Sequence, residues 1–190
     1  MLRVLARTCL FLGCLVSVSV PVAAQEVIHA LTGTVSSIDD GTKTITVLED
    51  IGSKGVFEVM SNPKTRIEFD KKIEAETTAA EAFKKSGAYV IVFYFGDINK
   101  PTVAALKSLG TGPFSSLVGK VEKFESREHA ISVEDSSGKV QTFKIDANTV
   151  AETNFGVEEG LKFHAQAGDQ VRVVSATVDG SPTAMFLREM

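Results

Sequence analysis

The sequence predicts an all-β protein with short helices, built from two tandem copies of one five-stranded unit. Two stretches of equal length, "LTGTVSSIDDGTKTITV" at 31–47 and "LVGKVEKFESREHAISV" at 117–133, carry Leu, Gly, Val, Ile and Val at the same places. A second pair of stretches, 87–109 and 168–190, matches at an offset of 81 residues, whereas the first pair matches at 86. Ordered matches that differ by a single change in length indicate a tandem duplication.

The first three strands of each copy follow from alternation and turn signals. Residues 31–35 alternate apolar and polar side chains, the period of a half-buried strand. Asp40-Gly41 is a hairpin signal, and the alternation resumes over 44–47. A third strand is expected roughly over 56–60, because Phe57 and Val59 align with apolar residues of the second copy.

A helix and two more strands complete the unit. The stretch "KKIEAETTAAEAFKKSG", 71–87, is rich in Ala, Glu and Lys and ends in a glycine, which predicts a helix. Strands are expected over 88–95 and 102–107. The second copy gives the same order, with "NFGVEEGLKFHAQAG", 154–168, as a shorter helix.

The predicted order β-β-β-α-β-β in about 80 residues is that of the OB-fold, a small five-stranded barrel. Gly33 and Gly119 suit the bend that its first strand needs. An SH3-like barrel is the alternative, but a helix between the third and fourth strands favours the OB-fold. The expected fold is therefore two tandem OB-fold-like five-stranded barrels.

The expected domain order begins with a signal peptide over 1–24. Arg3 and Arg7 precede an apolar run that is too short to span a bilayer comfortably, and Val22-Ala23-Ala24 suits a cleavage site after Ala24. Lipidation at Cys14 is the alternative for this segment. The first barrel is then expected over 25–109, a Gly, Pro and Ser linker over 110–116, and the second barrel over 117–190.

Composition restricts the compartment and the partners. Both cysteines, Cys9 and Cys14, lie in the predicted signal peptide, so the mature chain would have no disulfide and no thiolate ligand. Removing 1–24 takes away two arginines and no acid, which moves the net charge from −4 to −6. An acidic chain is poorly suited to nucleic acids, whose binding depends on neutralising phosphates. No later stretch is long and apolar enough for a transmembrane segment, and we expect a periplasmic or secreted protein.

The stretch "TGTVSSIDDGTKTITV", followed by "FEV" and a strand that begins at a glycine, resembles the periplasmic copper- and silver-binding chaperones of Cus-type efflux systems. It also looks like broader groups of exported bacterial OB-like domains. The resemblance implies a barrel for each copy. In the chaperones a His near the end of strand two, a Met-x-Met pair before strand three and a Trp hold Cu(I).

The metal ligands of those chaperones are missing at the matching places. Strand two ends in "ITVLED" and "ISVED" without His, "SKGV" and "KVQT" hold no Met, and the chain has no Trp. Cu(I) prefers thiolate, thioether or imidazole ligands. The three histidines, His29, His129 and His164, show no paired ligand spacing. We therefore expect no metal site and no cofactor.

Acidic pairs and nucleophile motifs give no catalytic residue either. Glu49-Asp50 and Glu134-Asp135 end strand two in both copies, and such acids in turns are more typical of solvated loops than of a Ca²⁺ site. No G-x-S-x-G motif is present. The sequence thus points away from an enzyme.

The stretch "AYVIVFYFGD", 88–97, yields the candidate interface. One face of this strand matches the second copy and should point into the barrel. The other face is apolar in the first copy and much more polar in the second, where Gln170 and Arg172 stand. A strand that is apolar on both faces is usually covered on both, so this stripe should contact the second barrel or a partner. The candidate interface residues are Tyr89, Ile91, Phe93 and Phe95.

These observations favour a non-catalytic, exported binding or scaffolding protein. Its expected partner is a cell-envelope protein or a small ligand, with no nucleic acid. The alternative function is a periplasmic metal-handling accessory protein of the copper or silver type with non-standard ligands.

Overall fold

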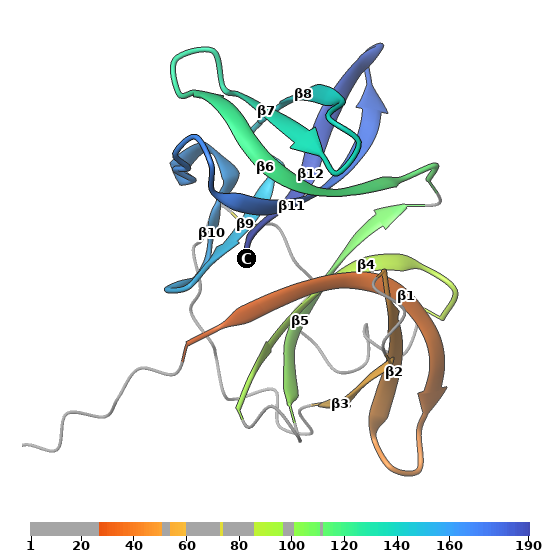
Figure 1. Ribbon diagram of the computed structural model, residues 1–190. Coiled ribbons are helices and arrows are strands. Elements are labelled where there is room, and N and C mark those ends of the chain that lie inside the picture. Colours follow the sequence, from red (N-terminus) through yellow and green to blue (C-terminus); the bar gives the residue numbers. More distant parts are fainter. Residues whose placement is uncertain (1–26, 51–53, 60–72, 74–85, 97–100, 111) are drawn as a thin grey trace, which may run out of the picture.

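The computed structural model describes residues 27–50, 54–59, 73, 86–96, 101–110 and 112–190, and these residues form two β-sheets (Figure 1). The first sheet contains β1 (His29–Asp39), β2 (Thr44–Glu49), β3 (Lys54–Val59), β4 (Tyr89–Phe95) and β5 (Thr102–Gly110). The second contains β6 (Ser115–Glu125), β7 (Ala130–Asp135), β8 (Val140–Lys144), β9 (Val150–Thr153), β10 (Gly156–Glu159), β11 (Gln170–Val178) and β12 (Ser181–Glu189). The predicted all-β architecture with two sheets is confirmed. No helix among the described residues is long and apolar enough to cross a membrane.

The first sheet closes on itself in the strand order β1-β2-β3-β5-β4. Strand β1 makes this possible because its first half pairs with β4 and its second half with β2. The ring is completed by a short parallel contact between β3 and β5, Glu58 to Thr102 and Val59 to Val103. Figure 1 shows β1 curving strongly around the sheet.

The second sheet repeats this ring and adds a hairpin. Strands β8, β7, β6, β11 and β12 follow the order of β3, β2, β1, β4 and β5, and β12 pairs with β8 at Thr183 and Lys144. The added strands β9 and β10 attach beside β12, with β9 parallel to it. The two copies also share irregularities: a bulge follows Val35 in β1 and Val121 in β6. This repetition is what a duplicated unit should show.

Gly33 and Gly119 lie where the first strand of each ring changes partner. Gly33 pairs with both Val90 and Glu49, and Gly119 pairs with both Val171 and Asp135. A Cβ on Gly119 would come within 2.2 Å of the Glu134 carbonyl oxygen, and one on Gly33 within 2.4 Å of the Leu48 carbonyl oxygen. Glycine is needed here because no side chain fits between the crossing strands.

Each ring encloses its own apolar core. In the first ring the largest core side chain is Phe57, and in the second its equivalent Phe143 lies beside Phe163. The inward faces of β4 and β11 contribute valines at matching places, as the alternation predicted. Burying a side chain of this kind stabilises the fold by about 1.5–3 kcal/mol relative to exposure.

The predicted helix of the second copy, 154–168, is wrong. The chain there forms β10, one turn of 3-10 helix (Gly160–Lys162) and a loop. Tertiary contacts override the helical composition: β10 pairs with β9, and Gly160 packs so closely that a Cβ would lie 2.5 Å from the Thr149 side chain. The predicted helix of the first copy, 71–87, lies outside the described residues except for Ile73, 86 and 87.

The acidic pairs that end strand two are not equivalent residue by residue. Glu49 pairs with Gly33, whereas Asp135, not Glu134, pairs with Gly119. Asp50 therefore corresponds to Ser136, and the apparent match of Glu49-Asp50 with Glu134-Asp135 is shifted by one position. Asp135 caps its own turn through hydrogen bonds from Ser137 and Lys139.

Candidate functional site: the joint between the two sheets

A third apolar cluster lies between the two rings, and we call the contact that it forms the joint. Its first-sheet members come from β1, β4 and β5, and its second-sheet members from β9, β11 and β12. The buried members are Ala30, Ile73, Ile91, Phe93, Ala105, Val150, Val174 and Phe186. Two pairs of these members are related by the internal repeat, because Val174 is the equivalent of Phe93 and Phe186 of Ala105. Related faces of the two copies thus pack against each other.

The candidate interface residues predicted on β4 divide into two groups. Ile91 and Phe93 are fully buried members of this cluster. Tyr89 is half-buried at its margin, where its ring stacks on Phe114 with 4.7 Å between the centroids. Phe95 is half-buried at the end of β4 and is not among the residues of the cluster. The structure therefore brings three of the four residues to the joint.

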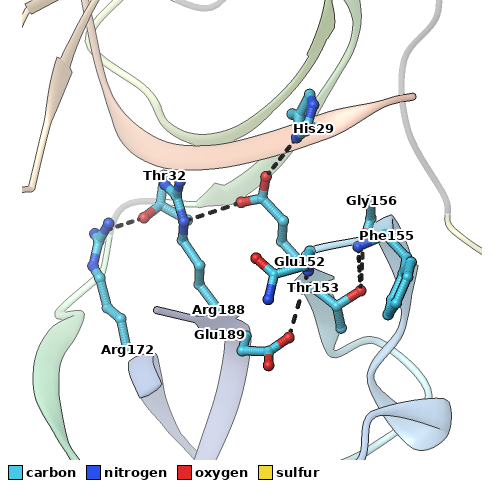
Figure 2. A network of polar contacts seen from close by, with 10 residues as sticks. His29, Thr32, Glu152, Thr153, Phe155, Gly156, Arg172, Arg188 and Glu189 are labelled. Carbon is cyan, nitrogen blue, oxygen red and sulfur yellow. Dashed lines mark hydrogen bonds and ion pairs between the residues drawn. The ribbon is translucent and has the colours of Figure 1, made fainter. Parts of the chain in front are cut away.

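A buried guanidinium crosses the joint at one side. Arg172 on β11, 3% exposed, donates from Nη2 to the Thr32 hydroxyl at 2.8 Å and forms an ion pair with the Asp50 carboxylate of the first sheet. Its Nε donates to the Ser116 hydroxyl at 3.2 Å. Figure 2 shows Arg172 reaching from the second sheet to Thr32. Asp50 compensates the charge and the two hydroxyls accept hydrogen bonds from the guanidinium, as a buried charge requires.

The Asp50 carboxylate accepts hydrogen bonds from side chains of three strands, β1, β4 and β11. The Thr32 hydroxyl donates to its Oδ2 at 2.8 Å and the Tyr89 hydroxyl at 2.5 Å, in addition to Arg172. Burial raises the pKa of Tyr89 well above its usual value, and the hydrogen bond to Asp50 adds to the rise. The phenol therefore stays protonated and serves as a donor, which excludes it as a general base near neutral pH.

A buried carboxylate crosses the joint at another side. Glu152 on β9, 4% exposed, lies 3.2 Å from Nδ1 of His29 in the first sheet and 3.3 Å from Nε of Arg188 on β12. Figure 2 shows its carboxylate between these two side chains. Burial raises the pKa of Glu152, while Arg188, the Ala30 N–H and His29 act in the opposite direction. Desolvation is the larger effect, so folding disfavours the charged carboxylate on balance.

Two further hydrogen bonds join the two sheets. Nζ of Lys107 on β5 donates to the Asn148 carbonyl oxygen at 2.8 Å. The Val157 N–H of β10 donates to the Ile28 carbonyl oxygen at 3.0 Å, so the start of the first sheet extends the edge of the second. The joint is thus both apolar and polar.

The ionisable groups of the joint bind one another across the two sheets. No described group of three His, Cys, Asp or Glu side chains is placed to hold a metal ion. His29 has Glu152 as a partner, and the ring of His164 contacts Phe124 at 5.9 Å.

Sequence reasoning missed the polar half of the joint. In the sequence, Arg172 stands out only as a polar residue on the face equivalent to the apolar stripe. The signal that could have identified it is that it stands at the position of Ile91, in a strand whose neighbours are apolar. Glu152 gave no local signal, because its partners lie 123 and 36 positions away in the chain.

Comparisons with known proteins add little. No family model matches the chain, and no curated protein matches it. Among solved structures, one that is similar is described as "Crystal structure of the tetrameric p202 HIN2", with a TM-score of 0.27 and 11% sequence identity over 87% of this chain and 92% of that chain. A likeness of this degree carries no argument about function.

Proposed function

We propose that this chain is a non-catalytic, exported binding or scaffolding protein of the cell envelope, built from two OB-like barrels. The observation that supports this role best is the joint. It uses the buried side chains of Arg172 and Glu152, the first paired with Asp50, to hold two rings together. Such an assembly presents two barrel surfaces at a fixed spacing, which suits a scaffold.

The strand order supports the OB-like assignment of each ring. A five-stranded closed ring in which the first strand pairs with both the second and the fourth is a Greek-key barrel of the kind that the OB-fold describes. Barrels of this kind act as binding platforms, although fold alone does not determine function. The export signal predicted over 1–24 supports a location outside the cytoplasm.

An exposed aromatic residue offers a place to test for a partner. Phe155 lies at the tip of the β9–β10 hairpin with 93% of its surface exposed. The hairpin is held by bonds from the Phe155 N–H to the Thr153 hydroxyl and from the Asn154 N–H to Glu189. Three residues before Phe155, Glu152 is fixed in the joint (Figure 2). The ring is therefore presented to solvent from an anchored support.

Affinity capture from the native cell envelope tests the proposal. Tagged wild-type protein should recover a partner in stoichiometric amount, and Phe155→Ser should lose most of it. Val56→Ser, which removes a 56% exposed side chain from the first ring, is the matched control and should recover the partner as wild type does. The purified mature protein should begin at Gln25. Copper or silver at stoichiometric level, with no partner recovered, would replace this proposal with the metal-handling alternative.

A further inference from the structure

A groove of about 340 Å³ opens on the second sheet, away from the apolar cluster of the joint. Its walls come from the first half of β6, the end of β7, β8 and β11. Phe143 and Ser175 lie at its buried base, and Ser115, Ser116 and Gln141 lie nearer to solvent. A volume of this order is within the range of small-molecule sites.

The internal repeat explains why the second sheet has this groove. Ser175 is the equivalent of Tyr94, since both lie directly after the point where the fifth strand of their ring has an extra, unpaired residue. In the first ring the Tyr94 ring lies 5.4 Å from Phe57, the equivalent of Phe143. The ring of His29 lies 5.7 Å from Tyr94, and Ser115 stands at the position of His29. Two serines thus replace two rings, and space opens above Phe143.

The charges around the groove disfavour a charged ligand of either sign. Asp135 lines the groove, and hydrogen bonds from Ser137 and the Lys139 N–H lower its pKa, so it remains an anion that repels anionic ligands. The Arg172 guanidinium donates to Ser116, a lining residue, but its charge is already paired with Asp50. The Asp135 and Arg172 charges thus both have partners within the protein, and neither is an unpaired charge that would attract a ligand of opposite sign.

The polar groups of the groove also disfavour an apolar ligand. Three serine hydroxyls and the Gln141 amide line it, and an apolar ligand would remove them from water without replacing their hydrogen bonds. Hydroxyl and amide groups both donate and accept, so they complement a ligand that does the same. The Phe143 ring and two aliphatic side chains of β6 offer surface for the C–H face of such a ligand.

We propose that this groove binds a neutral, polyhydroxylated ligand, namely one unit of an uncharged saccharide. The inference goes beyond the proposed function, because it concerns the second sheet alone and stands whether or not an envelope partner is captured. The two serines that replace Tyr94 and His29 are its structural basis.

Titrations of the full mature chain followed by amide NMR shifts test it. The neutral probes are maltotriose, cellotriose and tri-N-acetylchitotriose, the anionic probe is trigalacturonate and the cationic probe is spermidine. At least one neutral probe should shift the amides of residues 115–118 and 141–143 in a saturable way. Failure of all three neutral probes to do so, or larger shifts there with a charged probe, would overturn the proposal.

Ser175→Tyr is the decisive variant, because it restores the ring that the first copy carries at this place. It should lower the affinity for the neutral probe at least tenfold. The matched control is Ser181→Tyr, which adds the same side chain at an exposed position of β12 outside the groove and should leave binding unchanged. If Ser175→Tyr does not fold, Gln141→Ala should still weaken binding several-fold. Wild-type affinity in a folded Ser175→Tyr, or in Gln141→Ala when that variant is used instead, would contradict the proposed site.

Discussion

Arg172 occupies in the second ring the position that Ile91 occupies in the first. Ile91 pairs with Thr32 and Lys107, and Arg172 pairs with their equivalents, Val118 and Arg188. Both side chains are buried at the joint, but one is aliphatic and the other extends across to Thr32. The duplicated faces have therefore become different at this position, where the first copy supplies an aliphatic side chain and the second a cation.

Arg172→Met should strongly destabilise the protein. The change keeps an unbranched apolar stem but removes the guanidinium, which leaves the Asp50 carboxylate, 16% exposed, without its cation. Removing one partner of a buried ion pair costs about 3–5 kcal/mol, measurable as the free energy of unfolding in urea. Arg127→Met, at an exposed turn, is the control and should change it little. Adding Asp50→Asn to Arg172→Met should recover part of the loss, and a loss equal to that of the control would contradict the role of Arg172.

Glu152→Gln should remove a pH dependence from the stability. Because the pKa of Glu152 is raised from 4.5 in the folded chain, the folded protein keeps this proton to a higher pH than the unfolded chain does. The stability that this proton contributes is present below about the unfolded pKa and is lost as pH rises through the folded pKa. The unfolding free energy of wild type minus that of Glu152→Gln should therefore fall as pH rises from about 4 to about 8.

The control for this prediction is Glu122→Gln, which alters an exposed carboxylate on β6. The unfolding free energy of wild type minus that of Glu122→Gln should hardly change over the same pH range. Taking differences between variants cancels the contributions of other acids, including Asp39 and Asp135, whose pKa values are lowered and act in the opposite sense. A difference for Glu152→Gln that rises with pH would show that the ion pairs outweigh desolvation.

Local patterns predicted the strands, because alternation of apolar and polar residues reflects which face of a strand is buried. They failed for 154–168, where Glu, Leu and Lys favour a helix locally but strand pairing with β9 prevails. The apolar stripe of β4 was visible for the same reason as the strands were. The role of Arg172 on the facing strand could not be recognised from the sequence. Its partners are 122 and 140 positions away in the chain and come close only because the two sheets pack together.

Gly119→Ala should destabilise the second ring. Its new methyl group would lie 2.2 Å from the Glu134 carbonyl oxygen and 2.8 Å from Val133, and backbone cannot move aside without breaking the β6–β7 pairing. Overpacking of this kind costs about 1–3 kcal/mol, readable as a lower midpoint of thermal unfolding. Gly41→Ala is the control, because its methyl group would meet only the Asp39 carboxylate, at 3.2 Å. Equal midpoints for the two variants would contradict the close approach at Gly119.

Phe93→Ser and Phe95→Ser should have unequal effects, although the two residues share one face of β4. Phe93 is fully buried in the joint, so its replacement leaves a cavity between the sheets and a hydroxyl without a place in it. Truncating such a phenylalanine costs about 3–5 kcal/mol. Phe95 is half-buried at the end of the strand and should cost less than half of that. Urea unfolding gives both values, and small-angle scattering shows whether the rings of Phe93→Ser separate below the unfolding transition. Equal losses would mean that the joint extends along the whole strand, because only then would the apolar stripe act as one surface from Tyr89 to Phe95.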